Sequence, residues 1–121
     1  MKKLIIAFSI VSLTGCSTIQ ETVQQYWPKK HDPVMFNQLV EIDIAVEKQS
    51  CDSPTWNTVS PRVEQLARYS EWRKDPQTTN IKGLLQHTHR MEQGGSKAFC
   101  EIGKRTAQQR IQAVRQAWEG R

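Results

Sequence analysis

The residues of this sequence that could carry out acid–base, redox or metal chemistry are spaced in ways that do not favour a catalytic site. His87 and His89 are two positions apart, so on a helix their side chains would point about 200° away from each other. Cys51 and Cys100 do not form a Cys-x-x-Cys pair, the arrangement that lowers the pKa of a nucleophilic thiol. A zinc site at these two cysteines and a histidine is conceivable, but no ligand spacing supports it.

Two further patterns have simpler explanations than catalysis. Asp43 and Glu47 would share one face of a helix, where a solvated acidic face is far more common than a general acid and base. The segment Gly94–Lys97 has part of the composition of a phosphate-binding loop, but it lacks the second half of that spacing. A turn followed by a helix N-cap explains it equally well. We identify no Ser–His–Asp set, and we expect a protein that is not an enzyme and has no metal or cofactor.

The first residues differ in character from the rest of the chain. Lys2 and Lys3 precede an apolar run, Leu4–Leu13, which as a helix would be about 15 Å long, half of the ~30 Å hydrocarbon core of a bilayer. A segment of this length is typical of a cleavable export signal. It ends in Leu13-Thr14-Gly15-Cys16, which resembles the lipobox of bacterial lipoprotein precursors. The resemblance implies that residues 1–15 are removed and that Cys16 carries the lipid that holds the protein to a membrane.

The residue after the lipobox cysteine and the net charge restrict location and partners. In Gram-negative lipoproteins an aspartate after the cysteine commonly signals retention in the inner membrane, and this chain has Ser17 there. By that resemblance we expect the outer membrane, on the side that faces the periplasm. Removal of the signal would lower the net charge from +5 to +3, which is too small to indicate a nucleic-acid partner.

The two remaining cysteines predict a disulfide. If Cys16 is lipidated, Cys51 and Cys100 are left as one even pair, and exported proteins fold in an oxidising compartment. The alternative is two free, buried thiols. A bond across about fifty residues would stabilise the fold by roughly 4 kcal/mol in the chain-entropy model.

The pattern of apolar residues predicts an all-α domain over residues 33–121, a small bundle of about four short helices, after a tether over residues 16–32. Asp32-Pro33 fits a helix start with an aspartate N-cap and a proline at the first helical position. The first helix would bury the stripe Met35, Leu39, Ile42, Val46. The segment 40–46 also alternates as a strand would, but no partner strand is evident.

Three more helices follow by the same reasoning. Ser60-Pro61 and Asp75-Pro76 are expected to start the second and third, and Gly94-Gly95 to end the third. Ser96 is expected to cap the fourth, which would bury the stripe Cys100, Gly103, Ala107, Ile111, Val114, Trp118. The region of the first helix is rich in acidic residues and that of the fourth in basic ones, so these helices are expected to attract each other.

Two tryptophans outside the core stripes are candidates for contacts with a protein partner. Trp56 is expected in the loop after the first helix, and Trp72 at the end of the second helix beside Arg73 and Lys74. If exposed, these side chains could act as interface anchors, because tryptophan and arginine are enriched at binding hot spots. The alternative is that the tryptophans belong to the small core.

The layout also resembles that of small lipoproteins of marine bacteria and their tailed phages. The resemblance rests on the lipobox, the two later cysteines, the run Arg73–Gln77 and the ending Trp118–Arg121. It implies no activity. We therefore expect a non-enzymatic envelope lipoprotein that binds another envelope protein, in a phage context by blocking a receptor or modifying the envelope. The alternative from another class is a small periplasmic ligand-binding module or enzyme, which should enclose an apolar cavity with converging polar groups.

Overall fold

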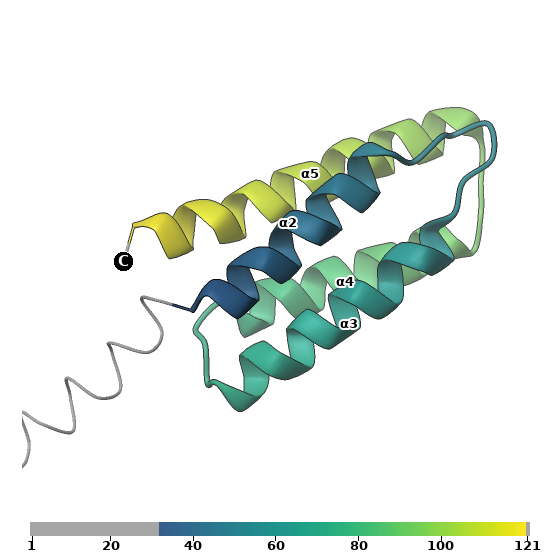
Figure 1. Cartoon of the computed structure of the whole chain (residues 1–121). Helices are drawn as coiled ribbons and strands as arrows, with labels where there is room; N and C mark the ends of the chain where they lie inside the picture. Colours follow the sequence, from purple (N-terminus) through teal and green to yellow (C-terminus); the bar gives the residue numbers. More distant parts are fainter. Residues whose placement is uncertain (1–31, 121) are drawn as a thin grey trace, which may run out of the picture. The chain divides into compact units, whose positions relative to one another are not determined.

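Four helices make up the part of the chain that the computed structural model describes, residues 32–120. They are α2 (Pro33–Glu47), α3 (Trp56–Trp72), α4 (Thr78–Glu92) and α5 (Lys97–Glu119). Consecutive helices run in opposite directions, and α2 lies beside α5, so that each helix packs against two neighbours (Figure 1). The prediction of an all-α bundle of four helices is therefore confirmed. The predicted signal segment 1–15, the lipobox and the tether up to residue 31 lie outside the described residues.

The core is formed by one buried apolar stripe from each of the four helices. Each helix places one side chain inward per turn, so residues three or four positions apart are buried together. The stripes predicted for α2 and α5 are both buried over their full length. The buried apolar side chains are Met35, Leu39, Ile42, Val46, Trp56, Val59, Val63, Leu66, Ala67, Ile81, Leu84, Met91, Cys100, Ala107, Ile111, Val114 and Trp118.

The N-caps predicted for the first and last helices are present. Oδ1 of Asp32 accepts hydrogen bonds from the backbone N–H groups of Val34 and Met35, at 3.1 and 3.2 Å. Oγ of Ser96 accepts one from the N–H of Phe99 at 3.1 Å. Each cap provides an acceptor for N–H groups that have no partner within the helix, a contribution of typically about 1 kcal/mol.

The predicted start of α3 was wrong. The helix begins at Trp56, not at Ser60-Pro61, and Pro61 lies within it. Pro61 is the sixth residue of the helix, beyond the first four N–H groups that have no intrahelical acceptor, so it removes one backbone hydrogen bond. The earlier start also brings Trp56 into the core, where burial of a large aromatic side chain outweighs one lost backbone hydrogen bond.

The predicted start of α4 was also wrong, by a few residues. Asp75 and Pro76 form a turn that precedes the helix, and α4 begins at Thr78. The Asp75 carboxylate accepts a hydrogen bond from the N–H of Gln77 at 2.8 Å, and the Thr78 N–H donates to the Asp75 carbonyl at 3.1 Å. Asp75 therefore organises this turn, as an N-cap would, but the helix proper starts after it.

The antiparallel arrangement gives the bundle two ends with different contents. The Asp32 end contains the start of α2, the turn 73–77 and the end of α5. The Cys51 end contains the loop 48–55 and the turn 93–96. None of the helices in residues 32–120 combines the length and apolar character that a membrane span requires.

Candidate interaction surface

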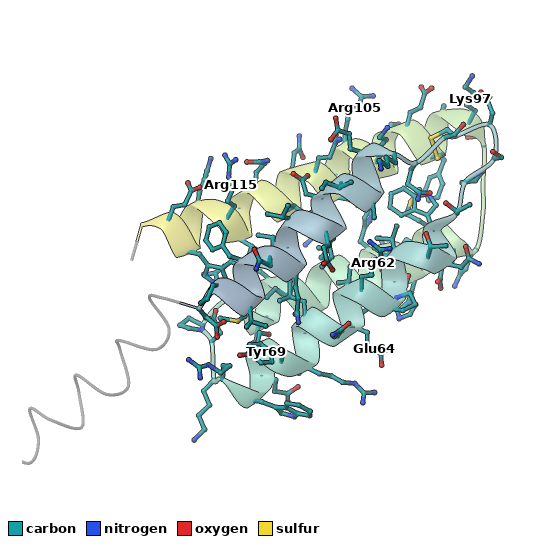
Figure 2. The ribbon with its side chains drawn as sticks, viewed as in Figure 1. Arg62, Glu64, Tyr69, Lys97, Arg105 and Arg115 are labelled. Carbon is teal, nitrogen blue, oxygen red and sulfur yellow. A yellow bond between two sulfur atoms is a disulfide. The ribbon has the colours of Figure 1, made fainter. Side chains whose placement is uncertain are left out.

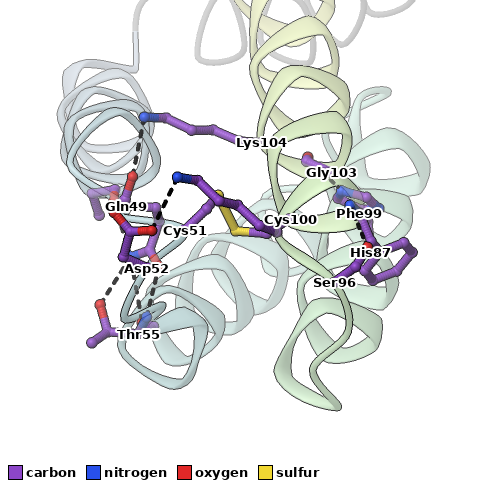
Figure 3. Close-up of a disulfide and its surroundings, with 12 residues drawn as sticks. Gln49, Cys51, Asp52, Thr55, His87, Ser96, Phe99, Cys100, Gly103 and Lys104 are labelled. Atoms are coloured by element: carbon purple, nitrogen blue, oxygen red, sulfur yellow. Dashed lines mark hydrogen bonds and ion pairs between the residues drawn. A yellow bond between two sulfur atoms is a disulfide. The ribbon is translucent and has the colours of Figure 1, made fainter.

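The disulfide between Cys51 and Cys100 lies at the Cys51 end. It joins the loop after α2 to the first turns of α5, with the two Cα atoms 5.6 Å apart, within the range that such a bond spans (Figure 3). Cys100 is 6% exposed and belongs to the core. The predicted disulfide is therefore present and connects the first described helix to the last.

Polar contacts around the disulfide also connect the loop after α2 to α5. Nζ of Lys97 lies 3.1 Å from Oδ1 of Asp52, and this carboxylate raises the pKa of the Lys97 ammonium group. Nζ of Lys104 donates to the carbonyl of Gln49 at 3.1 Å. Among the ion pairs within residues 32–120, the one between Lys97 and Asp52 joins the acidic first region to the basic last one, and it starts from the loop after α2, not from α2 itself. Arg105 lies on the outer side of α5 (Figure 2).

The two histidines on α4 have separate roles. His87 is buried, and its Nε2 donates a hydrogen bond to the carbonyl of Gly103 at 2.8 Å, which fixes α4 against α5. Nδ1 of His89 lies 3.1 Å from Oε2 of Glu92, and this hydrogen bond lowers the pKa of the Glu92 carboxyl group. No three histidine, cysteine or acidic side chains in residues 32–120 cluster as metal ligands would.

Trp56, which we predicted as a possible partner contact in an exposed loop, is part of the core. Its side chain is 3% exposed at the start of α3. The preceding residue, Thr55, is hydrogen-bonded to Gln49: the Thr55 N–H donates to Oε1 of Gln49 at 2.8 Å. The burial of Trp56 removes it from the candidate interaction surface.

The turn that ends α3 has the hydrogen bonds of a Schellman motif. The Lys74 N–H donates to the carbonyl of Glu71 at 3.0 Å, and the Asp75 N–H donates to that of Ser70 at 2.9 Å. The position after the helix cap in this motif takes a left-handed conformation, and Lys74 has a φ of 54°. Glycine is the usual residue there, because a side chain in this conformation costs about 1 kcal/mol.

The residues on either side of Lys74 are tied to other helices. Nε of Arg73 lies 3.1 Å from Oδ2 of Asp32 at the start of α2, and the Asp32 side chain is 5% exposed. Oδ1 of the buried Asp75 accepts a hydrogen bond from Nε1 of Trp118 on α5, at 3.1 Å. Arg73, which we predicted as a possible partner contact, therefore has a contact within the fold.

Trp72 and Lys74 are the predicted partner residues that remain at the surface. Trp72 is 79% exposed, more than any other large apolar side chain in residues 32–120. Lys74 is also exposed. Arg73 and Asp75 connect the turn that carries Lys74, and the end of α3 that carries Trp72, to α2 and α5.

A groove between α3 and α4 was not predicted from the sequence. It has a volume of about 270 Å³ and is open to solvent, with Ala67 and Leu85 as its apolar part. Charged and polar side chains line its rim: Glu64, Arg68, Glu71, Lys82 and Gln86. Lys82 pairs with Glu71 at 3.2 Å between the two helices. The helical stripe of α4 could have indicated Leu85, but the concavity depends on how the two helices pack.

Comparison of this chain with protein-family models, with curated proteins and with solved structures gives no match.

Proposed function

We propose that this protein is a non-enzymatic envelope lipoprotein, anchored through lipid on Cys16, whose helical bundle binds another envelope protein. The observation that supports a protein partner is the groove between α3 and α4. Its half-buried Leu85 and buried Ala67 offer an apolar floor, and its rim carries charges of both signs. About 270 Å³ accommodates one or two large apolar side chains.

The partner that fits this groove is a protein segment with an apolar side chain flanked by charged residues. An interface of this kind has an apolar centre and a polar rim. The groove is open and lies on the side of the bundle, so a helix or an extended segment could lie along it. In the envelope we propose the outer membrane, on its periplasmic side, because Ser17 follows Cys16.

The alternative is a ligand-binding module, and one observation favours it. A pocket of about 190 Å³ lies at the Cys51 end, lined in part by Pro54, Trp56, Met91 and Phe99. Nε1 of Trp56 is buried and has no hydrogen-bond partner among the described residues. A small ring-containing molecule with an oxygen acceptor could satisfy such a group, since an unpaired buried donor is costly.

Metabolic labelling and photo-crosslinking test the two parts of the proposal. A palmitate analogue should label the wild-type protein and not Cys16→Ser, and equal labelling of both would contradict the anchor. A photoreactive residue at Gln86, on the groove rim, should crosslink to one envelope protein in whole cells. The same residue at Gln109, on the exposed side of α5, is the matched control and should not.

A substitution in the groove tests whether the crosslink from position 86 arises from binding in the groove or from chance proximity of the two proteins. Leu85→Glu places a charge on the apolar floor and should abolish the crosslink from Gln86. Ile102→Glu, at a 57% exposed position on α5, should leave it unchanged. Circular dichroism must show that both variants are folded. A crosslink that survives Leu85→Glu would refute the groove as the binding site.

A further inference from the structure

We infer that the Asp32 end of the bundle docks on the bilayer surface, with the indole of Trp72 in the interfacial region and Lys74 on anionic head groups. This inference rests on the proposed lipid anchor. It assigns a membrane contact to two residues that the sequence alone indicated as contacts for a protein.

The position of Trp72 and Lys74 supports this orientation. The segment that would carry the lipid is covalently attached at Asp32, and Asp32 is paired at 3.1 Å with Arg73, the residue between Trp72 and Lys74. Cys16 precedes Asp32 by sixteen positions, so the lipid is at most about 55 Å from this end. The Cys51 end is the opposite end of the bundle from this attachment point, about 35 Å away along the 23 residues of α5.

The chemistry of the two side chains suits the membrane–water interface. Tryptophan is enriched at that level, because its ring is apolar and its N–H needs a polar partner. Lysine close to an anionic surface is attracted by the surface potential. None of the ion pairs within residues 32–120 involves Lys74, so its charge is available to head groups.

The geometry of the turn favours a bilayer over a protein for this contact. Trp72 does not line the groove between α3 and α4, and it is the last residue of α3, at the end of the bundle. Hot-spot tryptophans in protein interfaces are usually surrounded by other contacts that exclude water. A broad surface such as a bilayer can be reached by one projecting indole. The anchor also keeps this end at a high effective concentration near the surface, so a weak contact is sufficient.

Quenching of tryptophan emission by brominated lipids tests the docking. The full lipidated protein is reconstituted in vesicles of phosphatidylethanolamine and phosphatidylglycerol in a three-to-one ratio, with or without bromine on the acyl chains. The difference between the wild type and Trp72→Phe isolates the emission of Trp72. We expect bromination to remove about half or more of that emission, as for an indole at the interface.

Two variants act as controls for position and charge. Phe99→Trp in the Trp72→Phe background places an indole at the Cys51 end, where Phe99 is 39% exposed, and it should not be quenched. Lys74→Gly should lower the ratio of docked to undocked protein about fivefold on these anionic vesicles. It should have no effect on vesicles of phosphatidylcholine alone.

The outcomes distinguish this inference from the proposed function. If the wild-type protein floats with the vesicles but Trp72 is not quenched, the docking is refuted and the anchor stands. If the wild-type protein does not float, the anchor and the docking both fail. A photo-crosslink from position 72 to a protein in whole cells, with no quenching in vesicles, would assign this end to a protein partner and overturn the inference.

Discussion

Loss of the Cys51–Cys100 bond should destabilise the bundle by a large fraction of its total stability. The bond closes a loop with a sequence separation of 49, which contains the whole of α3 and α4. In the chain-entropy model a loop of this size corresponds to about 4 kcal/mol at 25 °C. Small domains have a free energy of unfolding of about 5–15 kcal/mol, so the reduced protein should be only marginally folded.

Thermal unfolding followed by far-UV circular dichroism measures this effect. For a domain of this size about 1 kcal/mol shifts Tm by roughly 4–8 °C, so reduction should lower Tm by about 15–30 °C. Cys51→Ala, Cys100→Ala and the double variant should show nearly the same loss, because each removes the same bond. Reducing agent should have no further effect on the double variant.

Two results would refute this reasoning about the disulfide. One is a shift of Tm by less than about 5 °C when the wild-type protein is fully reduced, since the entropic term alone predicts several times more. The other is a double variant that loses the sum of the two single losses. That result would mean that each cysteine stabilises the fold separately by packing.

The remaining predictions concern the Asp32 end and use the same thermal assay. Trp118→Phe should lower stability by about 1–3 kcal/mol, because it leaves the buried carboxylate of Asp75 without the indole donor; an unchanged Tm would show that this hydrogen bond contributes nothing. Arg73→Met should also lower Tm, because it leaves the nearly buried Asp32 carboxylate without its cation. The control Trp72→Phe, at the adjacent exposed position, should have a Tm within about 2 °C of the wild-type value. Equal effects of the two substitutions would contradict the structural role of Arg73. Lys74→Gly should raise stability by about 1 kcal/mol, because glycine adopts the left-handed conformation at lower cost, and a fall in Tm would refute that explanation.

Some features of the fold could be predicted because they depend on residues close in the sequence. The buried stripes of α2 and α5 recur every three or four positions, and this periodicity alone identifies the inner face of a helix. The caps at Asp32 and Ser96 are formed with backbone groups two or three residues away. The pairing of the two cysteines followed from their number, once the third was assigned to the lipid.

Other features could not be predicted because they depend on neighbours that are distant in the sequence. The local effect of Pro61 indicated a late start for α3, but the core that receives Trp56 is built from other helices and favours an earlier start. The groove between α3 and α4 likewise depends on the packing of two helices, and neither helix contains it alone.

The sequence by itself determined that Trp72, Arg73 and Lys74 stand together at the end of a helix, and it predicts a cleavable signal and a lipobox at the N-terminus. Only the tertiary structure decided which of these three side chains remain available for contacts outside the fold. Arg73 forms an ion pair within the fold, because the start of α2 brings the Asp32 carboxylate within 3.1 Å of it. The neighbouring Asp75 accepts a hydrogen bond, because the end of α5 brings the indole N–H of Trp118 to it. Trp72 and Lys74 remain at the surface. Contacts of this kind depend on which distant segments meet at the turn, and local sequence carries no information on that.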